Sequence, residues 1–301
     1  GLTGFVIRAF GWKYLLVPVG KMGGWNLFPP VAIGYMANNL LPARLGEFAR
    51  AYVVGKQENV SKSAALATIL VERIFDGLAL LLILATVSLF FPYPPWVKDG
   101  GFIVAVILVG LTIFLSLVAI KVSWALRLVN YTLGRVFSNM AKRMESRLLN
   151  FVVGLDLKQN LGSTILAFGF VLLRWLFEAC IYLSVLYAMD LQDMVPVHGA
   201  LFVMVAVNIA CMVPQAPGFV GSVQLASIES LAVFGVDREV AVAYSLLVHA
   251  AFFFPITLAG IVCLVRSHFS FAEIRGSRNT ENVDVMPENS SIQSNEQGIT
   301  S

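Results

Sequence analysis

Three long runs without a charged residue constrain this chain more than any other feature of its sequence. The runs extend from Gly77 to Trp96, from Gly100 to Ile120 and from Val240 to Val265. Each is long enough to cross a hydrocarbon core of roughly 30 Å as a helix that rises about 1.5 Å per residue. Because 58% of the residues are hydrophobic and only 13% are charged, a soluble fold could not bury this surface. The sequence therefore predicts an all-α polytopic membrane protein.

The composition argues against several classes of function. Cys180, Cys211 and Cys263 lie far apart inside apolar segments, which predicts neither disulfides nor a metal cluster. The formal net charge is +3, and no long basic stripe with interleaved aromatic residues is present, so we expect no nucleic acid partner. We also expect no cofactor and no bound metal.

The distribution of basic residues predicts how the helices are oriented. Residues 121–158 carry seven lysines and arginines against two acidic residues, so the positive-inside rule places this loop in the cytoplasm. The turns at residues 91–99 and 190–193 would then face outward. We therefore expect a multi-pass protein of the plasma membrane with a cytoplasmic C-terminus.

Residues 1–269 are predicted to form one transmembrane helical domain. Its first segment, Leu2–Val19, is too short and too basic to be a clean span, so we expect the domain to be truncated at its N-terminus, with an earlier helix or two missing. Residues 270–301 form the predicted tail, which from Gly276 onward is rich in Ser, Asn, Glu and Gln. Such a composition predicts a disordered cytoplasmic tail.

Two apolar segments are expected to form helix-break-helix hairpins that enter the bilayer and return. Leu27–Leu41 is short, contains two prolines and has basic residues on both flanks, as a hairpin entering from the cytoplasm would have. Val197–Phe234 is broken by prolines and glycines at Pro214–Gly218 and again at Gly221, without any charge at the break. For this second segment we favour a hairpin entering from outside, although two full crossings would leave the tail on the same side.

The chain also contains a candidate inverted repeat. A shift of 176 positions aligns Val60–Arg73 with Val236–His249, which are identical at four positions. Each stretch follows a proline-broken segment and opens a long span, and the predicted topology makes the two spans run in opposite directions. Inverted repeats of this kind are found in many secondary transporters. A chance match between two stretches rich in Ala, Val and Leu is the alternative.

Charged residues inside predicted spans are the leading functional candidates. Glu72, Arg73 and Asp76 lie near the start of one span, and Arg174 and Glu178 lie one helical turn apart in another. An ionised side chain at the bilayer centre costs at least about 2.5–3.5 kcal/mol, so such groups face the bundle interior, pair or line water. The alternatives are an interfacial position for the first group and a packing ion pair for the second.

Three further charges and one histidine complete the candidates. Arg44, Glu47 and Arg50 follow the first hairpin at spacings of three, so they share a helical face that is either functional or a solvated basic flank. His249 is alone on its span and is either part of the site or a hydrogen-bonded packing residue. Together with the charges above, these residues form a group with four of each sign. We hypothesise that its arginines bind an anionic head group while a neighbouring carboxylate takes up a proton.

Three blocks, NNLLPARLGEFAR, SAALATILVERIFDGLALL and VPQAPGFVGSVQLASIE, resemble the lysylphosphatidylglycerol synthase transmembrane-region family, also called flippase-like. The likeness covers most of Phe5–Val265 and implies that the chain moves lipid, since the best-understood members flip aminoacylated phosphatidylglycerol. We expect the family's membrane region without the soluble synthase domain, and Phe219 and Ser222 stand where glycine or threonine is more usual. The residues that match the family's motifs are Asn39, Pro42, Arg44, Gly46, Glu47, Arg50, Glu72, Arg73, Asp76, Pro214, Pro217, Gly218 and Gly221.

The sequence thus predicts a flippase-like transporter that moves an anionic or modified phospholipid, or a polyprenyl-type lipid, between leaflets. The alternatives are the membrane part of an aminoacyl- or glycosyl-lipid transferase system, and a scaffold for a separate lipid-modifying enzyme. An enzyme is the less favoured prediction because no Gly-rich phosphate loop, nucleophile elbow or zinc motif is present. The residues predicted to bind or transport the lipid are Asn39, Pro42, Arg44, Glu47, Arg50, Glu72, Arg73, Asp76, Arg174, Glu178, Pro214, Pro217, Gly218, Gly221 and His249.

Overall fold

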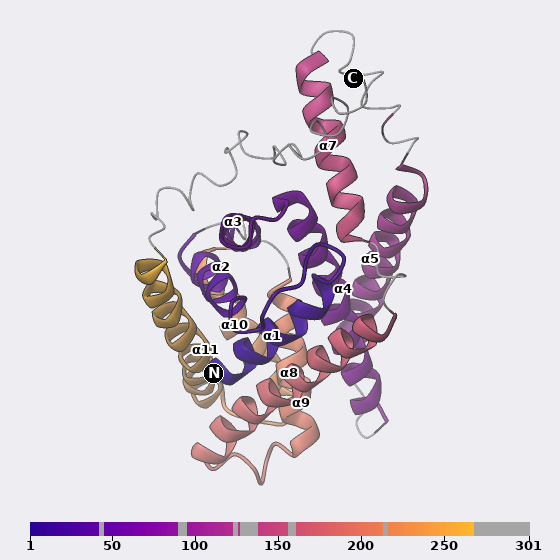
Figure 1. Cartoon of the computed structure of the whole chain (residues 1–301). Coiled ribbons are helices and arrows are strands. Elements are labelled where there is room, and N and C mark those ends of the chain that lie inside the picture. The colour runs from indigo at the N-terminus through magenta and orange to yellow at the C-terminus, as the bar shows by residue number, and fades with distance from the viewer. Residues whose placement is uncertain are drawn as a thin grey trace, which may run out of the picture.

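The fold is known from a computed structural model that describes residues 1–41, 45–89, 95–122, 126, 138–155, 161–212 and 216–267. Within these residues every regular element is a helix (Figure 1), which confirms the all-α prediction. The elements are α1 (Leu2–Leu15), α2 (Phe28–Leu40), α3 (Gly46–Gln57), α4 (Lys62–Val87), α5 (Pro95–Ile120), α7 (Ser138–Gly154), α8 (Leu161–Ala188), α9 (Val197–Ala210), the short 3-10 helix η2 (Pro217–Phe219), α10 (Ser222–Ala232) and α11 (Arg238–Arg266).

Three helices of the described chain are long and apolar enough to cross a membrane, judged by length and composition. They are Asp99–Ala119 within α5, all of α8 and all of α11. The uncharged run from Gly77 to Trp96 is divided between two helices, because α4 ends at Val87 and α5 starts at Pro95. Proline can begin a helix but cannot continue one without losing a backbone hydrogen bond, so the proline-rich stretch divides this run between two helices.

The second predicted helix-break-helix segment is present as a pair of packed helices, α9 and α10. The prediction for Leu27–Leu41 is wrong, because this segment forms the single helix α2, and its prolines lie in the first turn, where a helix tolerates them. The hairpin in this part of the chain is formed by α2 with α3 instead. In the first hairpin, α2–α3, Gly46 lies against Gly34, and the Gly46 N–H donates to Asn38 Oδ1 over 2.8 Å. In the second hairpin, α9–α10, the rings of Phe202 and Phe234 meet with their centroids 6.2 Å apart. Entry of either hairpin into the bilayer stays a prediction. Residues 42–44 and 213–215, which include the predicted site residues Pro42, Arg44 and Pro214, lie outside the described residues.

The described helices form two units that repeat one packing pattern, a first unit of α1–α4 and a second unit of α8–α11. In the first unit α1 packs on α2 and α4 and α3 packs on α4, while in the second α8 packs on α9 and α11 and α10 packs on α11. Each hairpin also reaches across to the other unit, since α2 packs on α11 and α9 on α4. The helices α1 and α8 pack on each other where the units meet, and α4 and α11 run in opposite directions (Figure 1).

The helix boundaries extend the predicted repeat beyond the aligned segment. The starts of α3 and α10, at Gly46 and Ser222, differ by 176 positions, as do the starts of α4 and α11 at Lys62 and Arg238. The ends of α2 and α9, by contrast, differ by 170 positions. The six additional residues fall between α9 and α10, in the segment that forms η2. The two units therefore correspond helix by helix, with one insertion at the tip of the second hairpin.

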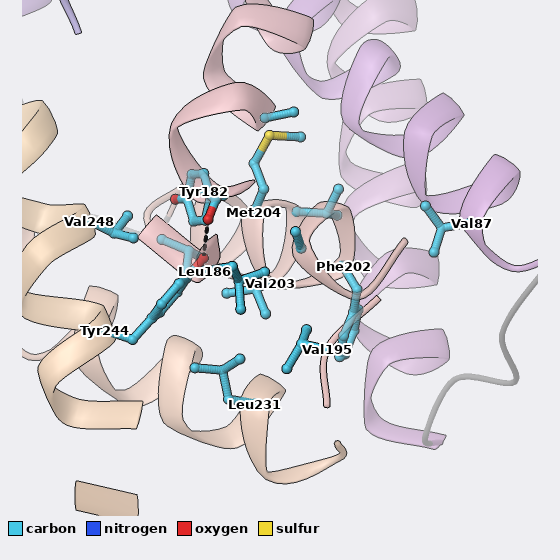
Figure 2. Packing of buried hydrophobic residues seen from close by; sticks show 14 of the residues in the cluster. Val87, Tyr182, Leu186, Val195, Phe202, Val203, Met204, Leu231, Tyr244 and Val248 are labelled. Atoms are coloured by element: carbon cyan, nitrogen blue, oxygen red, sulfur yellow. Dashed lines mark hydrogen bonds between the residues drawn. The ribbon is translucent and has the colours of Figure 1, made fainter. Parts of the chain in front are cut away.

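Equivalent positions in the two units make equivalent contacts. Trp12 Nε1 of α1 donates to Thr68 Oγ1 of α4 over 2.9 Å. In the second unit the Tyr244 hydroxyl of α11 donates to the Tyr182 carbonyl of α8 over 3.0 Å, in the middle of the larger apolar core (Figure 2). A buried indole or phenol needs such a partner. These hydrogen bonds join α4 to α1 in the first unit and α11 to α8 in the second.

Candidate functional site

A buried carboxylate on α4 gathers three arginines from three helices. Glu72 accepts two hydrogen bonds from Arg50 of α3, at 2.9 Å and 2.7 Å, and further ones from Arg8 of α1 and from its neighbour Arg73. The side chains of Glu72 and Arg50 are each 3% exposed. A two-pronged guanidinium–carboxylate contact is the strongest form of such a pair. Glu72 therefore holds α3 and α1 to α4.

The second carboxylate of α4 continues the network one helical turn later. Asp76 Oδ2 accepts from Arg8 Nη2 at 3.0 Å, and Oδ1 accepts from Arg174 Nη2 of α8 at 2.9 Å. Arg73 Nη1 lies 3.5 Å from Oδ2 on the cavity side. Since Arg8 and Arg174 belong to different units, Asp76 joins the two units where they meet.

The network ends on the second hairpin. Arg174 Nη1 donates to Glu178 Oε2 over 2.6 Å, and Glu178 Oε1 accepts from Asn208 Nδ2 of α9 over 2.9 Å. Two arginines of the network are also stacked on indole rings, Arg50 on Trp12 at 3.7 Å and Arg174 on Trp175 at 3.8 Å. Such cation–π contacts strengthen when the pair is desolvated. We call this set the ionic network; its charged members are Arg8, Arg50, Arg73, Arg174, Glu72, Asp76 and Glu178.

A cavity of about 490 Å³ lies beside the ionic network, within the size range of small-molecule sites. We call it the central cavity. One end is polar and is lined by Arg73, Asn38, Asn39 and Glu47. The Arg73 side chain is 27% exposed, whereas that of Arg8 is 5% exposed. Arg73 is thus the arginine of this network that is most open to the cavity.

Two polar atoms at this end have no hydrogen-bond partner among the described residues. They are Nε of Arg73 and Oε2 of Glu47. The guanidinium of Arg73 is otherwise held by the Tyr35 hydroxyl at 3.0 Å and by Glu72 at 2.9 Å. A buried polar group without a partner is costly, so both atoms offer a gain to a ligand that can pair with them.

Beyond this end, the wall includes Asp76, Arg174 and Glu178 of the ionic network together with many apolar side chains. Val248, Phe252 and Ile256 line it from α11, and Ile181 and Val207 line it from α8 and α9. The cavity therefore combines a charged end with an apolar wall, and it lies between the two units. Such a space fits a molecule that has a charged part and a hydrocarbon part.

His249 and Gln224 hold the tip of the second hairpin over the cavity. His249 Nε2 lies 2.8 Å from the Gly218 carbonyl, which can only accept, so this nitrogen carries the proton. Nδ1 then accepts from the Gln224 amide at 3.0 Å, and Gln224 Oε1 accepts from the Gly221 N–H at 2.7 Å. Gly218 and Gly221 have φ of 69° and 93°, values that favour glycine. His249 is thus a hydrogen-bonded packing residue that also lines the cavity.

The two hairpins meet at the same place. Asn39 Nδ2, at the end of α2, donates to Thr257 Oγ1 of α11 over 2.8 Å. A Cβ atom on Gly218 would lie 3.2 Å from the Asn39 carbonyl, so the two backbones touch. The break in each hairpin therefore lies next to the central cavity.

The structure brings most of the predicted site residues together. Eight of them line the central cavity, namely Asn39, Glu47, Arg73, Asp76, Arg174, Glu178, Gly218 and His249. Arg50 and Glu72 are buried and do not line the cavity, which contradicts a solvated flank for Arg50. Pro217 and Gly221 shape the second tip. Whether these residues act on a lipid stays a prediction.

The sequence prediction omits Arg8, Asn38 and Asn208. Arg8 lies in a basic segment that is hard to tell from a cytoplasmic margin, yet it contacts both carboxylates of α4. Arg44 lies outside the described residues, and Arg8 takes its place in the count. The described charges in and beside the cavity are then four positive and four negative, namely Arg8, Arg50, Arg73, Arg174, Glu47, Glu72, Asp76 and Glu178. If residues 2–15 had been predicted as a helix, Arg8 would have stood out as a charge inside an apolar helix. Among the described residues, no group of three His, Cys, Asp or Glu side chains could hold a metal ion.

An all-helical fold with long apolar helices, packed around a desolvated ionic network, defines a polytopic membrane protein. Residues 1–260 match the model of the lysylphosphatidylglycerol synthase TM region family. The chain belongs to that family.

Its relatives include a UPF0104 membrane protein of Methanothermobacter thermautotrophicus, 26% identical over 267 residues, which cover 82% of this chain and 76% of the relative. A UPF0104 membrane protein of Methanocaldococcus jannaschii is 26% identical over 226 residues, or 75% of this chain and 91% of the relative. No solved structure matches the chain significantly.

Proposed function

We propose that this protein moves an anionic or modified lipid, either a phospholipid or a polyprenyl-type lipid, between the two leaflets of the plasma membrane. The observation that supports this most is the central cavity, which joins an arginine-lined end to an apolar wall between two repeated units. Bundles of helices place ligand sites between facing helices, and transporters with inverted repeats place them between the repeats. A lipid head group would occupy the polar end, and its hydrocarbon part would lie along α11.

Arg73 is the residue that we assign to the anion. Its guanidinium is partly exposed to the cavity, and one of its nitrogens has no partner among the described residues. A guanidinium binds phosphate in two-pronged fashion. Arg73 can turn toward a phosphate at small cost, because Glu72 keeps Arg8 and Arg50 and Asp76 keeps Arg8 and Arg174.

The neighbouring carboxylate that takes up a proton would be Glu47. It lines the same end of the cavity, and its Oε2 atom has no hydrogen-bond partner among the described residues. Glu72, Asp76 and Glu178 are instead paired with arginines. A proton on Glu47 would offset the charge brought in or removed by the head group.

The proposed orientation has the C-terminus in the cytoplasm, and a separate lipid-modifying enzyme is the proposed partner. The basic segment at residues 121–158, which includes α7, supports this orientation. An enzyme on that side would deliver its lipid product to the inner leaflet, where the transporter would receive it.

Purified protein in liposomes tests the proposal. Labelled anionic phospholipid should move between leaflets in the absence of any activated donor, and Arg73→Gln should slow this movement. Arg266→Gln is the matched control, since Arg266 is exposed at the end of α11. Consumption of an aminoacyl or glycosyl donor without lipid movement would favour a transferase, and inactivity in both assays would favour a scaffold.

A further inference from the structure

The two hairpins differ in how closely they pack on the long helix of the other unit. In the first hairpin, α2 lies directly on α11, because Gly260 has no side chain. A Cβ atom there would meet the Met36 side chain and would lie 2.6 Å from the Ala32 carbonyl. Asn39 adds its hydrogen bond to Thr257 at the end of the same interface. The first hairpin is closed on α11.

The corresponding interface of the second hairpin, where α9 packs on α4, leaves a groove. Leu84 of α4 lies 176 positions before Gly260, and it lines a groove of about 390 Å³ together with Ala206 and Ile209 of α9. The other walls come from the start of α5 and from α10, including Leu225 and Glu229. We call this space the lateral groove. It lies where α2 and α11 touch in the other half of the molecule.

The side chains of the two interfaces are matched in size. In the closed interface a glycine, Gly260, faces a large residue, Met36. At the equivalent positions of the other interface, a large residue, Leu84, and a small one, Ala206, line the lateral groove. Small-against-large and large-against-small pairs fill similar volumes, so both interfaces can close with similar packing.

We propose that the protein has a second conformation in which the two hairpins exchange these arrangements. In that conformation the second hairpin closes the lateral groove against α4, and the first hairpin separates from α11. Because α4 and α11 run in opposite directions (Figure 1), we expect this exchange to change the side on which the central cavity opens. Packed interfaces are bistable, and rocking of one repeat against the other is the usual motion in proteins built from inverted repeats.

The contacts at the central cavity define what must change. The Asn39–Thr257 hydrogen bond holds the first hairpin closed, and the approach of Gly218 to Asn39 joins the two tips. Both would be lost in the exchange. The packing of α1 on α8, where the units meet, would be retained, and the contacts of Asp76 with Arg8 and Arg174 would hold that axis together. The inference goes beyond the proposed function, because it holds whatever molecule the cavity binds.

Distances between spin labels in lipid nanodiscs test the exchange. In a variant without its three cysteines, one label pair at Phe48 and Leu258 follows the first hairpin against α11. The matched pair at Leu225 and Leu82 follows the second hairpin against α4, and Leu82 and Leu258 are themselves equivalent positions. All four side chains are exposed. We expect two distances for each pair, with the first pair long when the second is short.

A cross-link then tests whether the hairpins are coupled. Leu84→Cys and Ile209→Cys, joined by a short bifunctional reagent, should fix the lateral groove shut and convert the Phe48–Leu258 pair to its long distance. A label pair at Leu2 and Leu176, on the axis helices α1 and α8, should keep one distance and reports that the variant is folded. Failure of the cross-link to form, or an unchanged Phe48–Leu258 distance after it forms, would overturn the proposal. Neither result depends on lipid transport, so this test and that of the proposed function fail separately.

Discussion

Removal of Arg8 should mainly lower the stability of the protein, whereas removal of Arg73 should mainly slow transport. Arg8 contacts both Glu72 and Asp76 and is 5% exposed, so Arg8→Gln leaves two buried carboxylates each short of one cation. Breaking a buried ion pair from one side costs about 3–5 kcal/mol. Arg73 is 27% exposed, and both carboxylates keep other arginines, so Arg73→Gln should cost only about 0–1 kcal/mol after allowance for solvent screening.

Unfolding by increasing denaturant in detergent micelles measures these costs, with Arg266→Gln expected within about 0.5 kcal/mol of the parent. The transport rate per folded molecule should fall more in Arg73→Gln than in Arg8→Gln. In Arg73→Gln, the lipid loses a charge-assisted hydrogen bond of about 1.5–3 kcal/mol, which should slow its translocation by roughly tenfold or more. If Arg73→Gln proves as destabilising as Arg8→Gln, the distinction between a structural and a cavity-facing arginine is incorrect.

Three further substitutions test the fold around the site. Gly46→Ala should destabilise by about 1–3 kcal/mol, because its methyl group would overlap the Gly34 carbonyl, whereas Gly110→Ala, with nothing within 4 Å, should be neutral or slightly stabilising in the same denaturant titration. Tyr244→Phe should cost about 0.5–1.5 kcal/mol through its lost hydrogen bond; an unchanged midpoint would argue against that bond. His249→Ala should impair transport and lower the free energy of unfolding by only about 1–3 kcal/mol, since it removes the hydrogen bond to the Gly218 carbonyl. Unimpaired transport would contradict a role for the tip.

The sequence predicts the parts of this fold that follow from local chemistry. Prolines and glycines mark the break between α9 and α10, and two of the three uncharged runs mark the long helices α5 and α11. The prolines of Leu27–Leu41 begin a helix instead of breaking one. The spacing of Glu72 and Asp76 places both carboxylates on one helical face, as the structure has them. These features depend on residues close together in the chain, which is why a pattern can reveal them.

The partners of those carboxylates could not be predicted in the same way. Arg8 reaches them across 64 and 68 positions of sequence, and nothing local distinguishes it from an arginine at a membrane surface. The full repeat was also hidden, because a single shift of the chain cannot align both sides of a six-residue insertion. Only the packing of α2 against α11 and α9 against α4 makes the correspondence complete.

Lipid translocation by the purified protein in donor-free liposomes tests the central claim most directly. Labelled anionic phospholipid placed in one leaflet should reach the other at a rate that the parent protein raises well above that of protein-free vesicles. Arg73→Lys should retain part of this rate, Arg73→Gln should lose most of it, and Arg266→Gln should keep all of it. Equal rates for Arg73→Gln and the parent, or no movement by the parent at all, would contradict the account.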